Sequence, residues 1–124
     1  MAKVKRDKDR EERISMEIIV DADGAEEQAM GWYYYLEEQI QFPFTAVCTE
    51  KRAISPLQIG DEVDVIGMAP EEECEREMFI IIGWDKGRLA VPLSHLKPID
   101  ATPAQTREAV EDWHYWVGMG YEFG

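Results

Sequence analysis

Apolar side chains recur at helical spacing in a stretch near the start of the chain. Ala29, Leu36 and Ile40 follow a period of about 3.6 residues, and Trp32 or Tyr33 falls on the same face. This pattern predicts an amphipathic helix.

The ends of this helix also have recognisable signals. Asp23 and Glu26 have the spacing of a capping box, which satisfies free backbone N–H groups at a helix start. The helix must end before Pro43, because a proline pushes the residue before it, Phe42, toward extended geometry.

The segment before it is ambiguous. Ile14, Met16, Ile18 and Val20 alternate as in a strand, but Ile14, Ile18 and Ile19 also fit a helix. We favour the helix because good helix formers precede it.

After Pro43 the pattern changes to short runs rich in Val, Ile and Phe, separated by turn residues. These runs predict strands at Phe44–Ile54, Glu62–Met68, Met78–Trp84 and Arg88–Val91, with a tight hairpin at Asp85–Gly87.

A second helix is expected at the end of the chain. Pro103 suits the first helical position after Thr102, and Val110, Trp113 and Val117 give one apolar face. The Leu57–Val65 segment, where a Gly-Asp turn leads into an alternating strand, is typical of small SH3-like barrels. We therefore predict an α+β fold: a small SH3-like antiparallel β-barrel flanked by an N-terminal and a C-terminal helix.

Charge divides the chain into two parts. Residues 1–13 hold six of the basic residues and four acidic ones, and we expect them to form a charged, frayed tail. Residues 14–124 carry 7 basic against 22 acidic residues and are expected to form a single domain.

The overall net charge of −13 excludes several classes of partner. An acidic surface repels nucleic-acid phosphates and anionic membranes, so we expect neither partner. The longest apolar run, Phe79–Trp84, is far shorter than the ~20 residues of a membrane-spanning helix. Cys48 and Cys74 cannot build a disulfide framework, so a cytoplasmic location is expected.

Catalytic patterns are missing from the sequence. His95 and His114 have no metal-ligand spacing, and Ser55 and Ser94 lack a nucleophile-elbow context. The cysteines form neither a C-x-x-C pair nor a zinc pattern. We therefore expect no enzymatic activity.

The four adjacent aromatic residues Trp32–Tyr35 have two interpretations. Side chains at four successive helix positions point around the whole helix, so some must contact a second element. The favoured interpretation places them in the core, and the alternative is an aromatic surface for a peptide partner.

Three groups of carboxylates are the candidates for a binding site. Glu37 and Glu38 lie at the end of the predicted helix, where the helix dipole disfavours anions and no basic residue lies one turn away. Asp61, Glu62 and Asp64 form the second group, in which Glu62 and Asp64 share the outer face of a strand. The third is the glutamate run 71–77, from which we select Glu72 and Glu75.

An all-oxygen acidic site favours calcium among the metals. Calcium takes about six to eight oxygen ligands, whereas zinc prefers His and Cys, which are scarce here. An EF-hand is excluded, because a loop read from Asp21 has Glu26 where glycine belongs and Trp32 where glutamate belongs. Any calcium site must combine distant segments.

Two blocks of sequence resemble the CcbP-type family of small calcium-binding proteins. The first runs over residues 29–38 (AMGWYYYLEE) and continues in Phe42-Pro43-Phe44 and Cys48. The second includes Gly67-Met68, Trp84-Asp85 and residues 89–93 (LAVPL). The resemblance covers about residues 18–97. It implies an acidic, non-EF-hand calcium binder with an SH3-like core, of buffering or signalling type.

Two hypotheses from different classes follow. The first is a calcium-binding protein whose clustered carboxylates hold Ca²⁺ without catalysis. The second is an SH3-like interaction module that docks an unknown peptide or protein partner, with acidity serving solubility.

Overall fold

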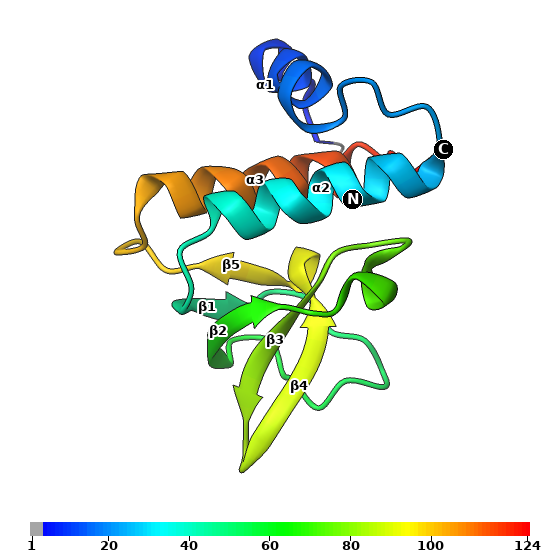
Figure 1. The fold of residues 1–124 in the computed structure, drawn as a ribbon. Coiled ribbons are helices and arrows are strands. Elements are labelled where there is room, and N and C mark those ends of the chain that lie inside the picture. The colour runs from blue at the N-terminus through cyan, green and yellow to red at the C-terminus, as the bar shows by residue number, and fades with distance from the viewer. Residues whose placement is uncertain (1–3) are drawn as a thin grey trace.

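The computed structural model describes residues 4–124 and has an α+β architecture. Its α-helices are α1 (Lys8–Arg13), α2 (Ala25–Gln39) and α3 (Ala104–Gly118), with a π-helix η1 (Ile14–Ile18) and short 3₁₀ helices η2 (Glu71–Cys74) and η3 (Leu93–His95). The strands are β1 (Phe44–Cys48), β2 (Glu62–Met68), β3 (Phe79–Trp84), β4 (Gly87–Pro92) and β5 (Leu96–Pro98). Figure 1 shows α2 and α3 side by side across the sheet, with α1 on the side of them away from the sheet.

The strands form one antiparallel sheet in the order β4-β3-β2-β1-β5. β4 and β5 lie at opposite edges, and within residues 4–124 they do not pair with each other, so the sheet is open. The α+β class and the flanking helices are confirmed, whereas the SH3-like closed barrel is not.

The predicted strands agree with the observed ones except at particular ends. β1 ends at Cys48 rather than Ile54, and residues 49–61 form a loop whose ends meet through the Gly60 N–H and the Cys48 carbonyl at 2.8 Å. The short strand β5 was not predicted. Trp84 pairs with Gly87, which confirms the tight β3–β4 hairpin.

The core lies between the α2–α3 pair and the sheet. Trp32 is fully buried against Trp113 and Trp116, with ring centroids 5.0 and 5.6 Å away. Leu36 from α2 and Ile80 and Ile82 from β3 are also fully buried, and belong to the same cluster. Burial of such large apolar side chains is the main driving force for docking the helices on the sheet.

The helix that we favoured for the ambiguous segment before α2 is present, with two differences. Residues 14–18 are helical, as expected, but as a π-helix. Residues 8–13, assigned from sequence to a polar tail, form α1, which contributes no buried residue. Gly31 lets α2 approach η1 closely, because a Cβ there would collide with the Ile18 carbonyl oxygen.

The predicted capping box is wrong. α2 begins at Ala25 with Gly24 as its N-cap, and Asp23 makes no side-chain cap. Instead the Asp23 backbone N–H donates to the Glu27 carboxylate at 3.2 Å. At the other end, the helix stops at Gln39, before Pro43, as expected.

None of the helices in the described part of the chain has the length and apolar character needed to cross a bilayer.

Candidate metal site

One face of α2 carries acidic and aromatic side chains toward η2. Glu26 and Glu37 lie about three turns apart and therefore point in nearly the same direction, with Met30 and Tyr33 between them. α2 packs against η2, so this face borders the glutamate run. Two chain segments distant in sequence thus contribute carboxylates to one acidic surface, where α2 meets residues 71–77, and we call this surface the groove.

Hydrogen bonds hold the two sides of this groove together. The Tyr33 hydroxyl donates to the Ala69 carbonyl at 2.6 Å, and the Tyr34 hydroxyl donates to the Glu71 carboxylate. Burial raises the pKa of Tyr33 to about 12, with further contributions from the negative charges of Glu37 and Glu71. The hydrogen bond to Glu71 is the main reason that the pKa of Tyr34 is raised. Glu37 and Glu71 therefore lie close to the same pair of phenols.

Cys74 is the residue by which the glutamate run packs into the core. It is fully buried, and its thiol contacts the Phe79 backbone N–H and carbonyl at 3.4 and 3.6 Å. Burial raises the pKa of the Cys74 thiol, and the charges of Glu73 and Glu77 raise it further. Because Cys74 points inward, the neighbouring glutamates are left on the surface.

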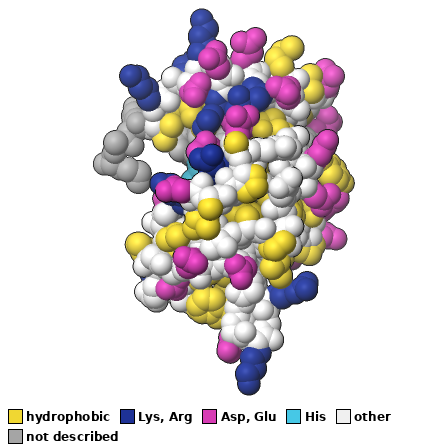
Figure 2. All heavy atoms as spheres, turned by 90° about the vertical axis from the view of Figure 1, so that its left-hand side faces the viewer, with side chains coloured by type: hydrophobic (Ala, Val, Ile, Leu, Met, Phe, Trp, Pro, Cys, Tyr) yellow, Lys and Arg dark blue, Asp and Glu magenta, His cyan; other side chains and the backbone are white. Residues whose placement is uncertain are grey.

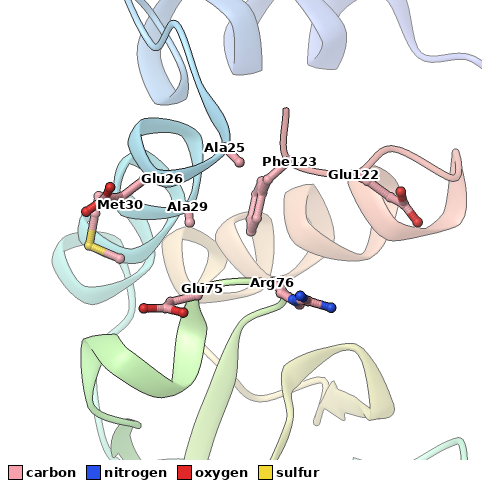
Figure 3. Close-up of a pocket in the computed structure, with 8 residues that line it drawn as sticks. All are labelled: Ala25, Glu26, Ala29, Met30, Glu75, Arg76, Glu122 and Phe123. Carbon is pink, nitrogen blue, oxygen red and sulfur yellow. The ribbon is translucent and has the colours of Figure 1, made fainter.

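A cavity of about 600 Å³ opens at the N-terminal end of the groove (Figure 3). Its walls come from the first turns of α2, the segment after η2 and the C-terminal tail. It is lined by Ala25, Glu26, Ala29, Met30, Glu75, Arg76, Glu122 and Phe123. Carboxylates from three separate segments, Glu26, Glu75 and Glu122, therefore share one cavity with a single guanidinium.

The structure places three of the predicted site residues in or beside this groove. Glu75 lines the cavity, Glu72 is exposed on η2, and Glu37 is close enough to Tyr34 for its charge to help raise the pKa of that phenol. Glu38 is also exposed, but successive helix residues are rotated by about 100°, so it points away from Glu37. The two adjacent glutamates do not form a pair.

The second predicted group lies on the sheet and is not brought to the groove. Glu62 and Asp64 are exposed on β2 while Val63 and Val65 are buried, as the alternation predicted. Thr45 donates to the Asp64 carboxylate at 3.3 Å across the β1–β2 pair. The Asp61 carboxylate accepts a 2.8 Å hydrogen bond from the Gln58 backbone N–H in the loop before the strand. Asp61 and Asp64 thus have local structural partners.

Within residues 4–124, no three His, Cys, Asp or Glu side chains converge closely enough to hold a metal ion in their present positions. The groove carboxylates are exposed and long, and like charges separate when nothing lies between them. Their oxygen chemistry fits calcium, but binding requires side-chain rotation toward the ion.

Sequence reasoning missed Glu26 and Glu122 as members of the groove, and it included Glu71 in the candidate run 71–77 without selecting it. Glu26 was interpreted only as part of a capping box. The available signal was its spacing of eleven residues from Glu37, which places both residues on one face of the helix. Glu122 follows the last helix, and no local pattern connects it to α2.

Sequence reasoning also missed a buried ionic cluster on the far side of α3. Asp112 is fully buried, and Arg13 and Arg10 of the N-terminal segment both bind its carboxylate, Arg10 at 3.1 Å. The Tyr35 hydroxyl donates to it at 2.7 Å. This cluster fastens α1 to α2 and α3 and lies apart from the groove.

Of the four aromatic residues in the Trp32–Tyr35 block, Trp32 and Tyr33 are buried and Tyr35 is half-buried. Tyr34 alone is half exposed, and its hydroxyl is committed to Glu71. The core interpretation is therefore confirmed for this block.

Figure 2 shows the face of the molecule on the left-hand side of Figure 1, where basic side chains lie at the top, in the middle and at the bottom among acidic and hydrophobic ones. The residues after position 13 remain strongly acidic, and Arg76 is the one basic residue in the run 71–77.

Comparisons with known proteins identify close relatives. The family model Calci_bind_CcbP, described as calcium binding, matches residues 12–117. The crystal structure of Anabaena CcbP is similar at 43% identity, with a TM-score of 0.84 and 98% coverage of both chains. A structure described as a calcium-binding protein in the calcium-binding form matches at 42% identity, with a TM-score of 0.83 and 98% coverage of both chains. A search of curated proteins gives no match.

Proposed function

The chain belongs to the CcbP family of calcium-binding proteins, and from that premise we propose that it binds Ca²⁺ in the groove between α2 and residues 71–77. The observation that carries this location is the shared cavity of Glu26, Glu75 and Glu122. Glu37, Glu71 and Glu72 extend the same acidic surface toward the C-terminal end of α2.

The chemistry of this groove suits calcium better than other metals. Its candidate ligands are carboxylate oxygens, and its remaining positions are open to water, as a cation of flexible coordination requires. Magnesium demands near-octahedral geometry and dehydrates reluctantly, so it is a weaker competitor. Zinc lacks ligands here, because His95, His114 and both cysteines lie outside the cavity lining.

The site that we propose is not an EF-hand. Residues 25–39 form α2, so a loop read from Asp21 would be helical over most of its length, which supports this part of the proposal. The ligands come instead from a helix face, a 3₁₀ segment and the C-terminal tail.

The exposure of these glutamates favours modest affinity. Each long side chain loses up to about 2 kcal/mol of conformational entropy when it is fixed on an ion. We propose that the protein is a cytoplasmic calcium buffer or signalling protein, and not one that keeps calcium permanently bound as a structural ion.

Calorimetric titration with calcium, with magnesium as competitor, tests the location. Glu75→Gln removes a cavity carboxylate, whereas Glu62→Gln removes the same charge from the sheet surface. Glu75→Gln should weaken binding about tenfold and Glu62→Gln less than threefold, as expected for one lost charged ligand. Equal effects would show that only net charge acts, and a larger effect of Glu62→Gln would move the site to the sheet.

A further inference from the structure

Arg76 is a cation among the carboxylates of the cavity. It lines the same 600 Å³ space as Glu26, Glu75 and Glu122. In Figure 3 the neighbouring side chains of residues 75 and 76 point apart: Glu75 toward the side of Glu26 and Met30, Arg76 toward the side of Glu122. The guanidinium therefore lies on the side of the cavity that the C-terminal residues Glu122 and Phe123 line.

No ion pair fixes Arg76 in the described part of the chain, whereas the nearby Arg52 is paired with Glu77 at 2.8 Å. Arg76 is exposed, and its long side chain can sample the cavity without leaving a fixed partner. A guanidinium that lines the same cavity as three carboxylates, without an ion pair to any of them, can lower their mutual repulsion and enter the space in which a metal ion would bind.

We infer that Arg76 is an affinity-determining residue that competes with calcium for the cavity carboxylates. This inference rests on the proposed calcium site. A guanidinium about 8 Å from a divalent ion in water repels it enough to raise a dissociation constant about fivefold. Arginine stays protonated at every physiological pH, so Arg76 lowers the calcium affinity even at pH values at which a histidine would be uncharged.

The test compares Arg76→Gln with Arg88→Gln. Arg88 is exposed on β4, near the tip of the β3–β4 hairpin, which points away from the helices in Figure 1. Both substitutions remove one positive charge. In calorimetric titrations at low ionic strength, Arg76→Gln should bind calcium about fivefold more tightly than wild type, and Arg88→Gln within about twofold of it. Arg76→Lys should remain close to wild type.

A second readout separates competition from a structural role. In the presence of a chelator, Arg76→Gln should melt at a lower temperature than wild type, because the cavity carboxylates have lost their counter-ion. The combination of lower stability without calcium and tighter calcium binding is specific to competition, since a structural role for Arg76 would lower both.

The outcomes distinguish this inference from the proposed site. Equal affinities for Arg76→Gln and Arg88→Gln, or weaker binding by Arg76→Gln, would overturn the role of Arg76. If Glu75→Gln still weakens binding in that case, the site itself stands. If neither Glu75→Gln nor Arg76→Gln differs from wild type, both the site and the inference are wrong.

Discussion

The hydroxyl of Tyr34, on α2, donates a hydrogen bond to the carboxylate of Glu71, on η2. The contact joins the two sides of the acidic groove and raises the pKa of the Tyr34 phenol. A calcium ion bound beside Glu71 would offset the negative charge that stabilises the protonated phenol, so calcium should lower this pKa. Ultraviolet titration of tyrosinate with and without calcium measures the shift.

Tyr34→Phe is the control for that titration, because it removes the phenol that is expected to respond. The difference between the titrations with and without calcium should disappear in this variant. A phenol pKa that calcium leaves unchanged in wild type would place the ion away from Glu71.

Glu37 and Glu38 are neighbours in sequence but face different directions on α2, and they provide a matched pair of variants. Glu37 lies on the α2 face that borders Glu71, about three helix turns from Glu26, so Glu37→Gln should weaken calcium binding about twofold more than Glu38→Gln. Both substitutions remove one charge from the same helix end, so global charge and the helix dipole change equally. Calorimetry measures the two affinities. A larger loss of affinity for Glu38→Gln would contradict a calcium site on the face of α2 that carries Glu37.

The Asp112 cluster should determine stability and leave calcium binding unchanged. Asp112→Asn leaves Arg10 and Arg13 without the carboxylate that both of them bind, and breaking a buried ion pair costs about 3–5 kcal/mol. Urea unfolding should show this loss, and calcium affinity of the folded variant should equal that of wild type.

Glu108→Gln is the control for Asp112→Asn. Glu108 is exposed and lies 3.7 Å from Arg13, so its removal should cost at most about 1 kcal/mol. Equal losses of stability in the two variants would mean that the buried cluster contributes no more than a surface ion pair.

Acidification should weaken the protein through its two histidines. Burial lowers the pKa of both His95 and His114, and the His114 Nε2–H donates to the Leu96 carbonyl at 2.7 Å. Below about pH 6.5 the unfolded chain takes up protons that the folded chain does not, so stability is present above that pH and falls as the pH decreases toward the lowered pKa values.

His114→Gln isolates this effect, since all carboxylates are unchanged in the variant. Urea unfolding at pH 7.5 and pH 5.5 should show a smaller loss of stability for His114→Gln than for wild type. An identical loss in both proteins would assign the acid sensitivity of folding to other groups.

Local patterns predicted most of the fold because its elements are marked by local chemistry. The periodicity around Trp32 and Leu36 and the alternation of Val63 and Val65 identify α2 and β2 directly. β5 was missed because three residues ending in proline give no periodic signal, and it exists through its pairing with β1. Closure of the sheet into a barrel depends on contacts between distant strands, which a turn motif cannot decide.

The candidate site was predictable only in part for the same reason. Glu75 and Glu37 stood out because each breaks a local rule, one in a dense run of like charge and the other at an unfavourable helix end. Glu122 and Arg76 belong to the site only because folding brings them into one cavity with α2. Asp112 belongs to an ionic cluster only because folding brings it to arginines that lie far from it in sequence. Such relationships arise from tertiary packing.

The most direct test of the central claim is a crystal of this protein grown with calcium, with the anomalous signal of calcium recorded. Our account predicts an anomalous peak in the groove, within coordination distance of at least one of Glu26, Glu75 and Glu122. A peak beside Glu62 and Asp64 on the outer face of β2, with none between α2 and residues 71–77, would contradict it.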